Sequence, residues 1–93
     1  MFIIRMMLVS KKIPNGKLLT VEWETDSGII KKIRITGDFF AYPESCIEEI
    51  EEALKGVYIK NIEEVLESTM KEKGFQIIGF SALDIQAILG GSE

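Results

Sequence analysis

Residues 33–44, which read IRITGDFFAYPE, carry the feature that most restricts how this chain can fold. An alternating strand pattern runs into a Gly-Asp break, two adjacent aromatic residues and Pro43. The Gly-Asp pair is typical of a turn, and proline suits the first turn of a helix. Because neighbouring strand residues point to opposite faces, Phe39 and Phe40 cannot both lie on the buried face. One ring must pack under the next helix or contact a molecule outside this chain.

Alternation with a period of two predicts two strands around this region. In residues 18–25, Leu19, Val21 and Trp23 share one face and polar residues take the other. Residues 29–36 follow the same pattern. Ile29, Ile33 and Ile35 lie on the inner face of the predicted strand, and Lys32 and Arg34 lie on the outer face. Lys31 interrupts the apolar face near the strand start, where it can reach solvent.

Residues 1–9 are apolar but are interrupted by Arg5, and they are far too short to span a bilayer. We interpret them as a first strand of a soluble cytoplasmic protein. Asn15-Gly16 predicts a hairpin turn, because both residues tolerate positive φ, and residues 26–28 predict a second turn. The simplest topology is an antiparallel three-stranded meander.

Three helices should follow the strands. Pro43 suits the start of the first, Asn61 can cap the second, and Ser81 with Asp84 forms an approximate capping box for the third. Gly56, Gly74 and the pair Gly90-Gly91 are expected at the ends. The inward stripes are Ile47, Ile50, Leu54 and Val57; Ile62, Val65, Leu66 and Met70; Ala82, Ile85 and Leu89. Residues 75–80 are either a fourth edge strand or a packed connector. The sequence therefore predicts one α+β domain over residues 1–93, with the helices on one face of the sheet.

Most catalytic signatures are absent from the sequence. The chain has no histidine, one cysteine and no Gly-rich phosphate loop, which excludes His-based nucleophile systems and common nucleotide sites. We interpret Cys46 as a core residue. The cluster Glu48, Glu49, Glu51 and Glu52 is expected to be a solvated helix face, in preference to an acid/base pair or a divalent-ion site. We predict no catalytic, cofactor-binding or metal-binding residue.

Charge is divided unevenly along the chain. Residues 1–36 hold seven Lys/Arg against three Asp/Glu, and residues 37–93 hold four against twelve. The acidic total disfavours nucleic-acid binding, and Trp23 lacks the companion aromatics of a base-stacking platform. The basic half, including lysines 11, 12 and 17, could still face an acidic partner.

The corner after the third predicted strand remains the candidate functional site. In one interpretation its residues only fill the gap between sheet and helix. In the other they form a contact surface for a partner protein, for which exposed aromatics are well suited. The partner-docking candidates are Gly37, Asp38, Phe39, Phe40 and Tyr42.

Four segments together resemble the C-terminal accessory domain of lipoate–protein ligases. They are residues 15–19 (NGKLL), 28–40 (GIIKKIRITGDFF), 47–56 (IEEIEEALKG) and 82–89 (ALDIQAIL). The similarity extends from about residue 7 to 89, and the Gly-Asp-Phe-Phe element after a charged strand is its most specific part. The chain lacks the lipoate loop and the adenylate-binding lysine motif of the catalytic part, so it resembles the separately encoded small subunit of two-part, archaeal-type ligases.

The resemblance implies an accessory subunit without an active site of its own. Such a subunit would form a heterodimer with a catalytic chain that uses ATP, Mg and lipoate, and it would be required for lipoyl-adenylate formation. The lipoyl-acceptor domain would be an indirect partner, and neither a membrane nor a nucleic acid is expected. The alternative is a stand-alone interaction or regulatory module that binds an acidic protein through the basic hairpins.

Overall fold

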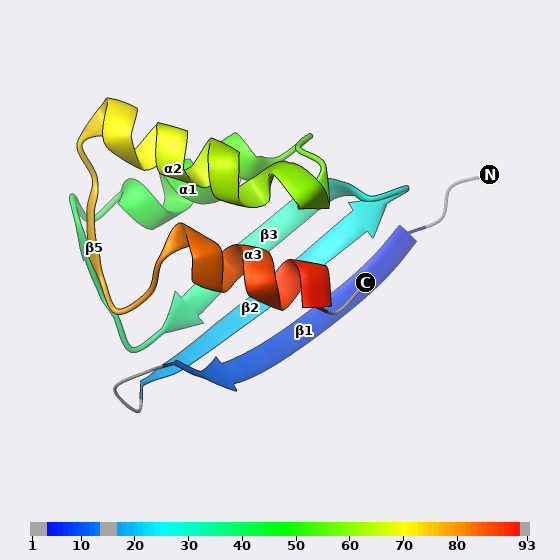
Figure 1. The fold of residues 1–93 in the computed structure, drawn as a ribbon, viewed down its shortest axis with the longest axis horizontal. Coiled ribbons are helices and arrows are strands. Elements are labelled where there is room, and N and C mark those ends of the chain that lie inside the picture. The colour runs from blue at the N-terminus through cyan, green and yellow to red at the C-terminus, as the bar shows by residue number, and fades with distance from the viewer. Residues whose placement is uncertain (1–3, 14–16, 92–93) are drawn as a thin grey trace.

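A computed structural model describes residues 4–13 and 17–91. Strands β1, β2 and β3 form an antiparallel sheet in that order, and the helices lie on one face of it (Figure 1). The predicted α+β class is confirmed; the predicted Asn15-Gly16 turn lies outside the described residues. The elements are β1 (Ile4–Lys12), β2 (Leu18–Asp26), β3 (Ile29–Gly37), β4 (Phe40–Tyr42), α1 (Cys46–Leu54), the 3-10 helix η1 (Ile59–Asn61), α2 (Ile62–Lys73), β5 (Gln76–Ile78) and α3 (Ala82–Gly91).

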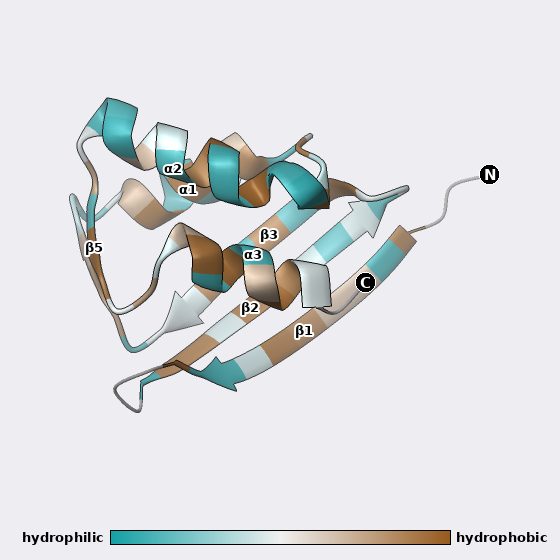
Figure 2. Cartoon of the chain, viewed as in Figure 1, coloured by the Kyte–Doolittle hydropathy of each residue, from teal (hydrophilic) through white to brown (hydrophobic). Residues whose placement is uncertain are grey.

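The inner face of the sheet and the helices share one apolar core. Leu19, Val21 and Trp23 of β2 are all buried, as their alternation predicts, and Glu22 on the opposite face is exposed. The helices contribute buried side chains at the predicted spacing: Ile50 and Leu54; Ile62 and Leu66; Ala82, Ile85 and Leu89. The hydropathy colouring shows hydrophobic and hydrophilic bands in turn along β2, whereas the middle of β1 is a continuous hydrophobic stretch (Figure 2). Because Trp23 is buried in this shared core, it is a core residue, as predicted.

A bulge in the β2–β3 pair corrects one prediction. Trp23 pairs with Ile33 and Glu24 with Lys32, but Thr25 pairs with Ile30, so Lys31 is skipped. The extra residue reverses the alternation. As a result Ile30 is fully buried, whereas Ile29, predicted to face the core, is only partly buried. Lys31, which interrupts the apolar pattern of the sequence, is the extra residue of this bulge.

The chain itself occupies the outer edge of β3. The backbone N–H of Ile30 donates to Val57 O at 2.9 Å, and Gly56 N donates back to Ile30 O at 2.8 Å. Further along the strand, Ile35 N donates to the Glu51 carboxylate of α1 at 2.8 Å. Backbone groups on a sheet edge that are paired in this way cannot template another strand.

The helix ends agree with the sequence in part. Ser81 and Asp84 form a reciprocal cap, with Ser81 N to Asp84 Oδ2 at 2.8 Å and Asp84 N to Ser81 Oγ at 3.2 Å. Gly74 closes α2 in the left-handed region. Pro43 does not open α1, because the helix begins three residues later, at Cys46, with Ser45 as its N-cap. The pair Gly90-Gly91 forms the end of α3, as expected, since the described helix runs to Gly91.

Beyond the predicted meander, β4 and β5 form a separate two-stranded sheet. Residues 75–80 therefore contain a strand, but that strand does not join the main sheet. Within the described ranges, none of the helices is long and apolar enough to cross a membrane.

Replacement of Glu51 tests the closure of the β3 edge. In Glu51→Ala the Ile35 N–H loses a charged acceptor at a partly buried site, so we expect a loss of about 1–2 kcal/mol in unfolding free energy, measured by urea denaturation. The matched control is Glu52→Ala, which removes an exposed ion pair to Lys55 and should change stability by less than about 0.5 kcal/mol. Equal effects of both variants would contradict the assigned role.

Candidate functional site

The candidate corner is built on a two-stranded ribbon. Strands β4 and β5 pair antiparallel, with Phe40 opposite Ile78, Ala41 opposite Ile77 and Tyr42 opposite Gln76. In Figure 1 this ribbon stands at the end of the molecule to which β3 runs, apart from β1. Of the docking candidates, Phe40 and Tyr42 thus lie on a strand that a distant part of the chain holds in place, whereas Gly37 ends β3 and Asp38 and Phe39 lie between the two strands.

One face of the ribbon is apolar and open to solvent. Phe40 is 59% exposed, Tyr42 61% and Ile78 70%. The intervening Ala41 and Ile77 point the other way and pack against the core. Gln76 is also exposed on this face, and we name the three large outward side chains Phe40, Tyr42 and Ile78 the ribbon surface. Because exposed large apolar residues gathered in one place are typical of interaction sites, this surface is the candidate for partner docking.

Phe39 takes the opposite role from its neighbour. Its ring packs edge-on against Phe80, with centroids 4.9 Å apart and an interplanar angle of 81°. Gly79 allows this approach, since a Cβ there would lie 2.7 Å from Phe39 Cβ. The two rings therefore differ: Phe39 fills the gap beneath the ribbon and Phe40 faces solvent. Partner contact through Phe40 stays a prediction.

Gly37 and Asp38 set the direction in which the ribbon leaves the sheet. Gly37 has a φ of 148°, and a Cβ there would collide with the carbonyl oxygen of Leu18. Asp38 N donates to that same oxygen at 3.0 Å. This close backbone approach requires glycine and turns the chain from β3 into β4. The two residues position the ribbon surface, and the exposed Asp38 borders it.

Sequence reasoning missed Ile78. The sequence leaves residues 75–80 open between an edge strand and a connector, and nothing local shows that Ile78 pairs with Phe40. The only available signal was an apolar residue inside the segment interpreted as an edge strand or connector.

The glutamates of α1 are divided among separate partners. Glu49 accepts from Lys73 Nζ at 3.1 Å and from Ser45 Oγ at 3.0 Å, Glu51 accepts from the β3 backbone, and Glu52 pairs with Lys55. Within residues 4–13 and 17–91, no three His, Cys, Asp or Glu side chains are grouped so that they could hold a metal ion. Glu49 and Glu51 thus link α1 to α2 and to β3, whereas Glu52 pairs at the end of its own helix.

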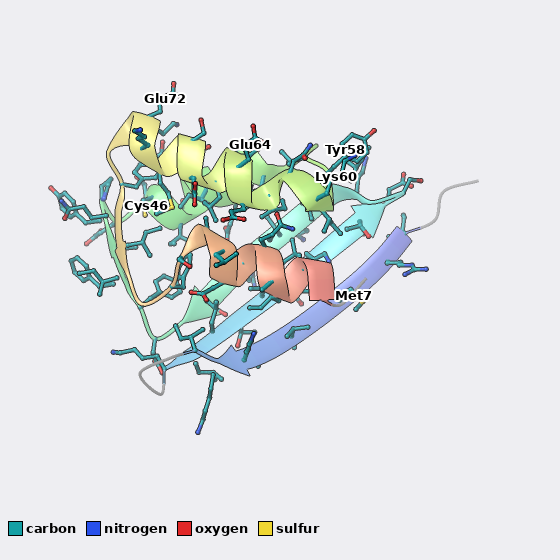
Figure 3. All side chains as sticks on the ribbon, viewed as in Figure 1. Met7, Cys46, Tyr58, Lys60, Glu64 and Glu72 are labelled. Carbon is teal, nitrogen blue, oxygen red and sulfur yellow. The ribbon has the colours of Figure 1, made fainter. Side chains whose placement is uncertain are left out.

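Cys46 lies buried at the start of α1 (Figure 3). Burial, with a smaller contribution from the charge of Glu49, raises the pKa of its thiol above the ordinary value. A thiol in this environment is protonated and unreactive at neutral pH.

Comparison of two adjacent variants tests the division between the rings. Phe39→Ala removes the contact with Phe80 and should cost about 2–3 kcal/mol in unfolding free energy. Phe40→Ala removes an exposed ring and should change stability by less than about 0.5 kcal/mol. Thermal melting followed by circular dichroism measures both, and a larger loss for Phe40→Ala would reverse the assignment.

The pH dependence of stability should report on Glu49. Hydrogen bonds from Lys73 and Ser45 lower its pKa below the ordinary 4.5. The stabilising effect of this carboxylate is present in full above pH 4.5 and is lost as the pH falls through the lowered pKa of the folded state. Glu49→Gln should therefore melt below the wild type at pH 7, and the two should converge in acid. Glu72→Gln, on the exposed end of α2, is the matched charge control and should melt like the wild type at pH 7.

Comparisons with known proteins agree on one family. The family described as bacterial lipoate protein ligase C-terminus matches residues 6–89. Lipoate-protein ligase A subunit 2 of Thermoplasma acidophilum is 39% identical over 49 residues, which are 53% of this chain and 52% of that protein. The aligned segment thus spans about half the length of this curated relative.

A solved structure gives a fuller match. It is described as an archaeal lipoylation system of Thermoplasma acidophilum, with a bipartite lipoate protein ligase and its E2 lipoyl domain. One of its chains is 30% identical with a TM-score of 0.74, and the superposition covers 91% of this chain and 97% of that one. Because the family match extends over nearly all of the sequence, this chain belongs to the family of lipoate protein ligase C-terminal domains.

Proposed function

We propose that this chain is the non-catalytic accessory subunit of an ATP-dependent lipoate–protein ligase and works in the cytoplasm. A separate catalytic subunit would hold the active site and use ATP, Mg and lipoate. The observation that carries the proposal is the match to 97% of one chain from a structure that contains a bipartite lipoate protein ligase. The structural roles of the α1 carboxylates and of Cys46 support a chain that contributes no reactive group.

The accessory role concerns the first half-reaction. The lipoate carboxylate attacks ATP and displaces pyrophosphate to form lipoyl-adenylate, a mixed anhydride that water hydrolyses. The lipoyl group then passes to a lysine of the acceptor domain with release of AMP. Docking of this chain on the catalytic subunit would order loops around the two substrates and exclude water. A preference for the closed conformation of the catalytic subunit would shift its population towards the competent state.

The ribbon surface has the properties required for docking. Phe40 and Tyr42 come from one strand and Ile78 from its partner, so three large side chains project from a paired backbone. Phe39, Ala41 and Ile77 anchor that backbone to the core. A rigid aromatic surface loses little conformational entropy when it is covered, which is why aromatic residues often dominate binding energy.

Reconstitution tests the proposed function. The catalytic subunit from the same organism is assayed for lipoyl-adenylate formation with ATP, Mg and lipoate, with increasing amounts of this chain. We expect the rate to rise and to saturate at one chain per catalytic subunit. An equal rate without this chain would contradict the proposal, and so would adenylate formation by this chain alone.

The ribbon surface has its own prediction. Phe40→Ala and Tyr42→Ala should each weaken binding to the catalytic subunit roughly tenfold while leaving the melting temperature unchanged. Leu83→Ala is the matched control, because Leu83 is equally exposed, at 60%, but lies on α3. Isothermal titration calorimetry measures the affinities, and comparable losses for Leu83→Ala and Phe40→Ala would remove the ribbon from the interface.

A further inference from the structure

The two edges of the main sheet differ in how they are covered. At β3, residues of the segment that follows α1 and a glutamate of α1 occupy the edge. At the other edge, β1 pairs with β2 along all nine of its residues, and the described part of the chain places no strand on its outer side. A nine-residue strand that is open on one side is a template for the addition of another strand.

The outer face of β1 is apolar and unusually exposed. Ile4, Met6 and Leu8 alternate along it, with between 55% and 75% of each residue accessible. On the adjoining strands, Glu22 and Glu24 of β2 lie opposite Arg34 and Lys32 of β3, respectively. On this face the carboxylates of β2 and the cations of β3 therefore form complementary cross-strand pairs. The apolar residues of β1 have no strand beside them on the outer side, within the described part of the chain.

The charge of β1 indicates what kind of strand fits it. The strand carries Arg5, Lys11 and Lys12 and has no carboxylate. Arg5 and Lys11 lie on its inner side, opposite Thr25 and Leu19. A strand with acidic side chains at the inward positions complements these cations.

A second copy of this chain fits the edge poorly. Antiparallel pairing of β1 with itself over its full length would set Leu8 opposite Leu8 and Arg5 opposite Lys11, twice in each symmetric pair. Like charges directly opposite one another destabilise a sheet. Charge therefore favours a different chain with carboxylates at those positions.

We propose that the open edge of β1 receives an extended strand of the catalytic subunit, which carries apolar side chains outward, beside Met6 and Leu8, and carboxylates inward, beside Arg5 and Lys11. This inference rests on the proposed function and deepens it. Backbone hydrogen bonds along the edge would fix the register, and the alternating side chains would provide specificity.

The test uses Met6→Lys/Leu8→Lys, which sets charge on the outer face of the edge. The two lysines would stand opposite Glu24 and Glu22, so the isolated domain should keep its melting temperature. Affinity for the catalytic subunit should fall roughly tenfold or more. Glu64→Lys is the control, because it changes the net charge by the same amount on the exposed face of α2, in the helical layer (Figure 3). It should bind like the wild type.

A second variant and a second measurement address strand addition itself. Lys11→Glu reverses an inward charge at an exposed position, so it should also weaken binding, and the affinity of the complex should become less sensitive to salt. On binding of wild type, the backbone amides of residues 4–12 should gain protection from hydrogen exchange.

The outcomes separate the two proposals. If wild type neither binds nor activates the catalytic subunit, the proposed function fails. If wild type binds and activates it while Met6→Lys/Leu8→Lys binds equally well, or the β1 amides gain no protection, only the strand addition is overturned. A wild-type dimer in light scattering that Met6→Lys/Leu8→Lys converts to a monomer would assign the edge to a second copy and would also overturn it.

Discussion

Burial of one face of a three-stranded sheet beneath one helical layer is the constraint on which the rest of this molecule depends. A chain of 93 residues buries only about 60–65% of the surface that its unfolded form exposes, so it has material for one core. That core takes Leu19, Val21 and Trp23 from the sheet and the inward stripes of the helices. The outer face and the outer side of β1 are left without cover from the described chain. The residues on these two surfaces therefore depend on solubility and on partner binding, and not on packing within the chain.

The two edges of the main sheet are covered differently, and this difference makes the domain asymmetric. Closure of the β3 edge uses Gly56, Val57 and Glu51, and the bulge at Lys31 sets Ile30 where it can exchange two hydrogen bonds with that segment. No comparable segment of residues 4–13 and 17–91 reaches β1. A sheet closed on one side can be extended only on the other. A further strand can therefore be added only beside β1, which carries exposed apolar residues and positive charge.

The sequence predicted the parts that follow from local periodicity. Alternation in β2 identified its buried face, and the spacing of Ser81 and Asp84 identified a helix start that the structure confirms. Alternation failed at Ile29, because a bulge breaks the period of two without leaving a local signal other than a misplaced lysine. Pro43 predicted a helix start, but α1 begins three residues later, at Cys46. Local rules therefore failed where the backbone departs from regular geometry.

The candidate site was predictable only in part for a related reason. Adjacent aromatic residues on a strand must separate, which the sequence shows, but the choice of outward ring depends on β5, whose Ile78 pairs with Phe40 from far along the chain. The proposed edge of β1 depends likewise on an absence of cover that no local pattern reveals. Both properties are decided by tertiary structure.

The ribbon surface and the β1 edge differ in what they can contribute to one complex. The ribbon follows β3, and β1 lies at the opposite edge of the sheet, with β2 between them. Strand addition is directional and fixes register through backbone hydrogen bonds, whereas aromatic side chains contribute binding energy through buried area. For a partner that contacts both, the β1 edge would fix the orientation and the ribbon surface would contribute most of the affinity. Because binding to the folded state stabilises it, a domain with one thin core would also gain stability from that partner.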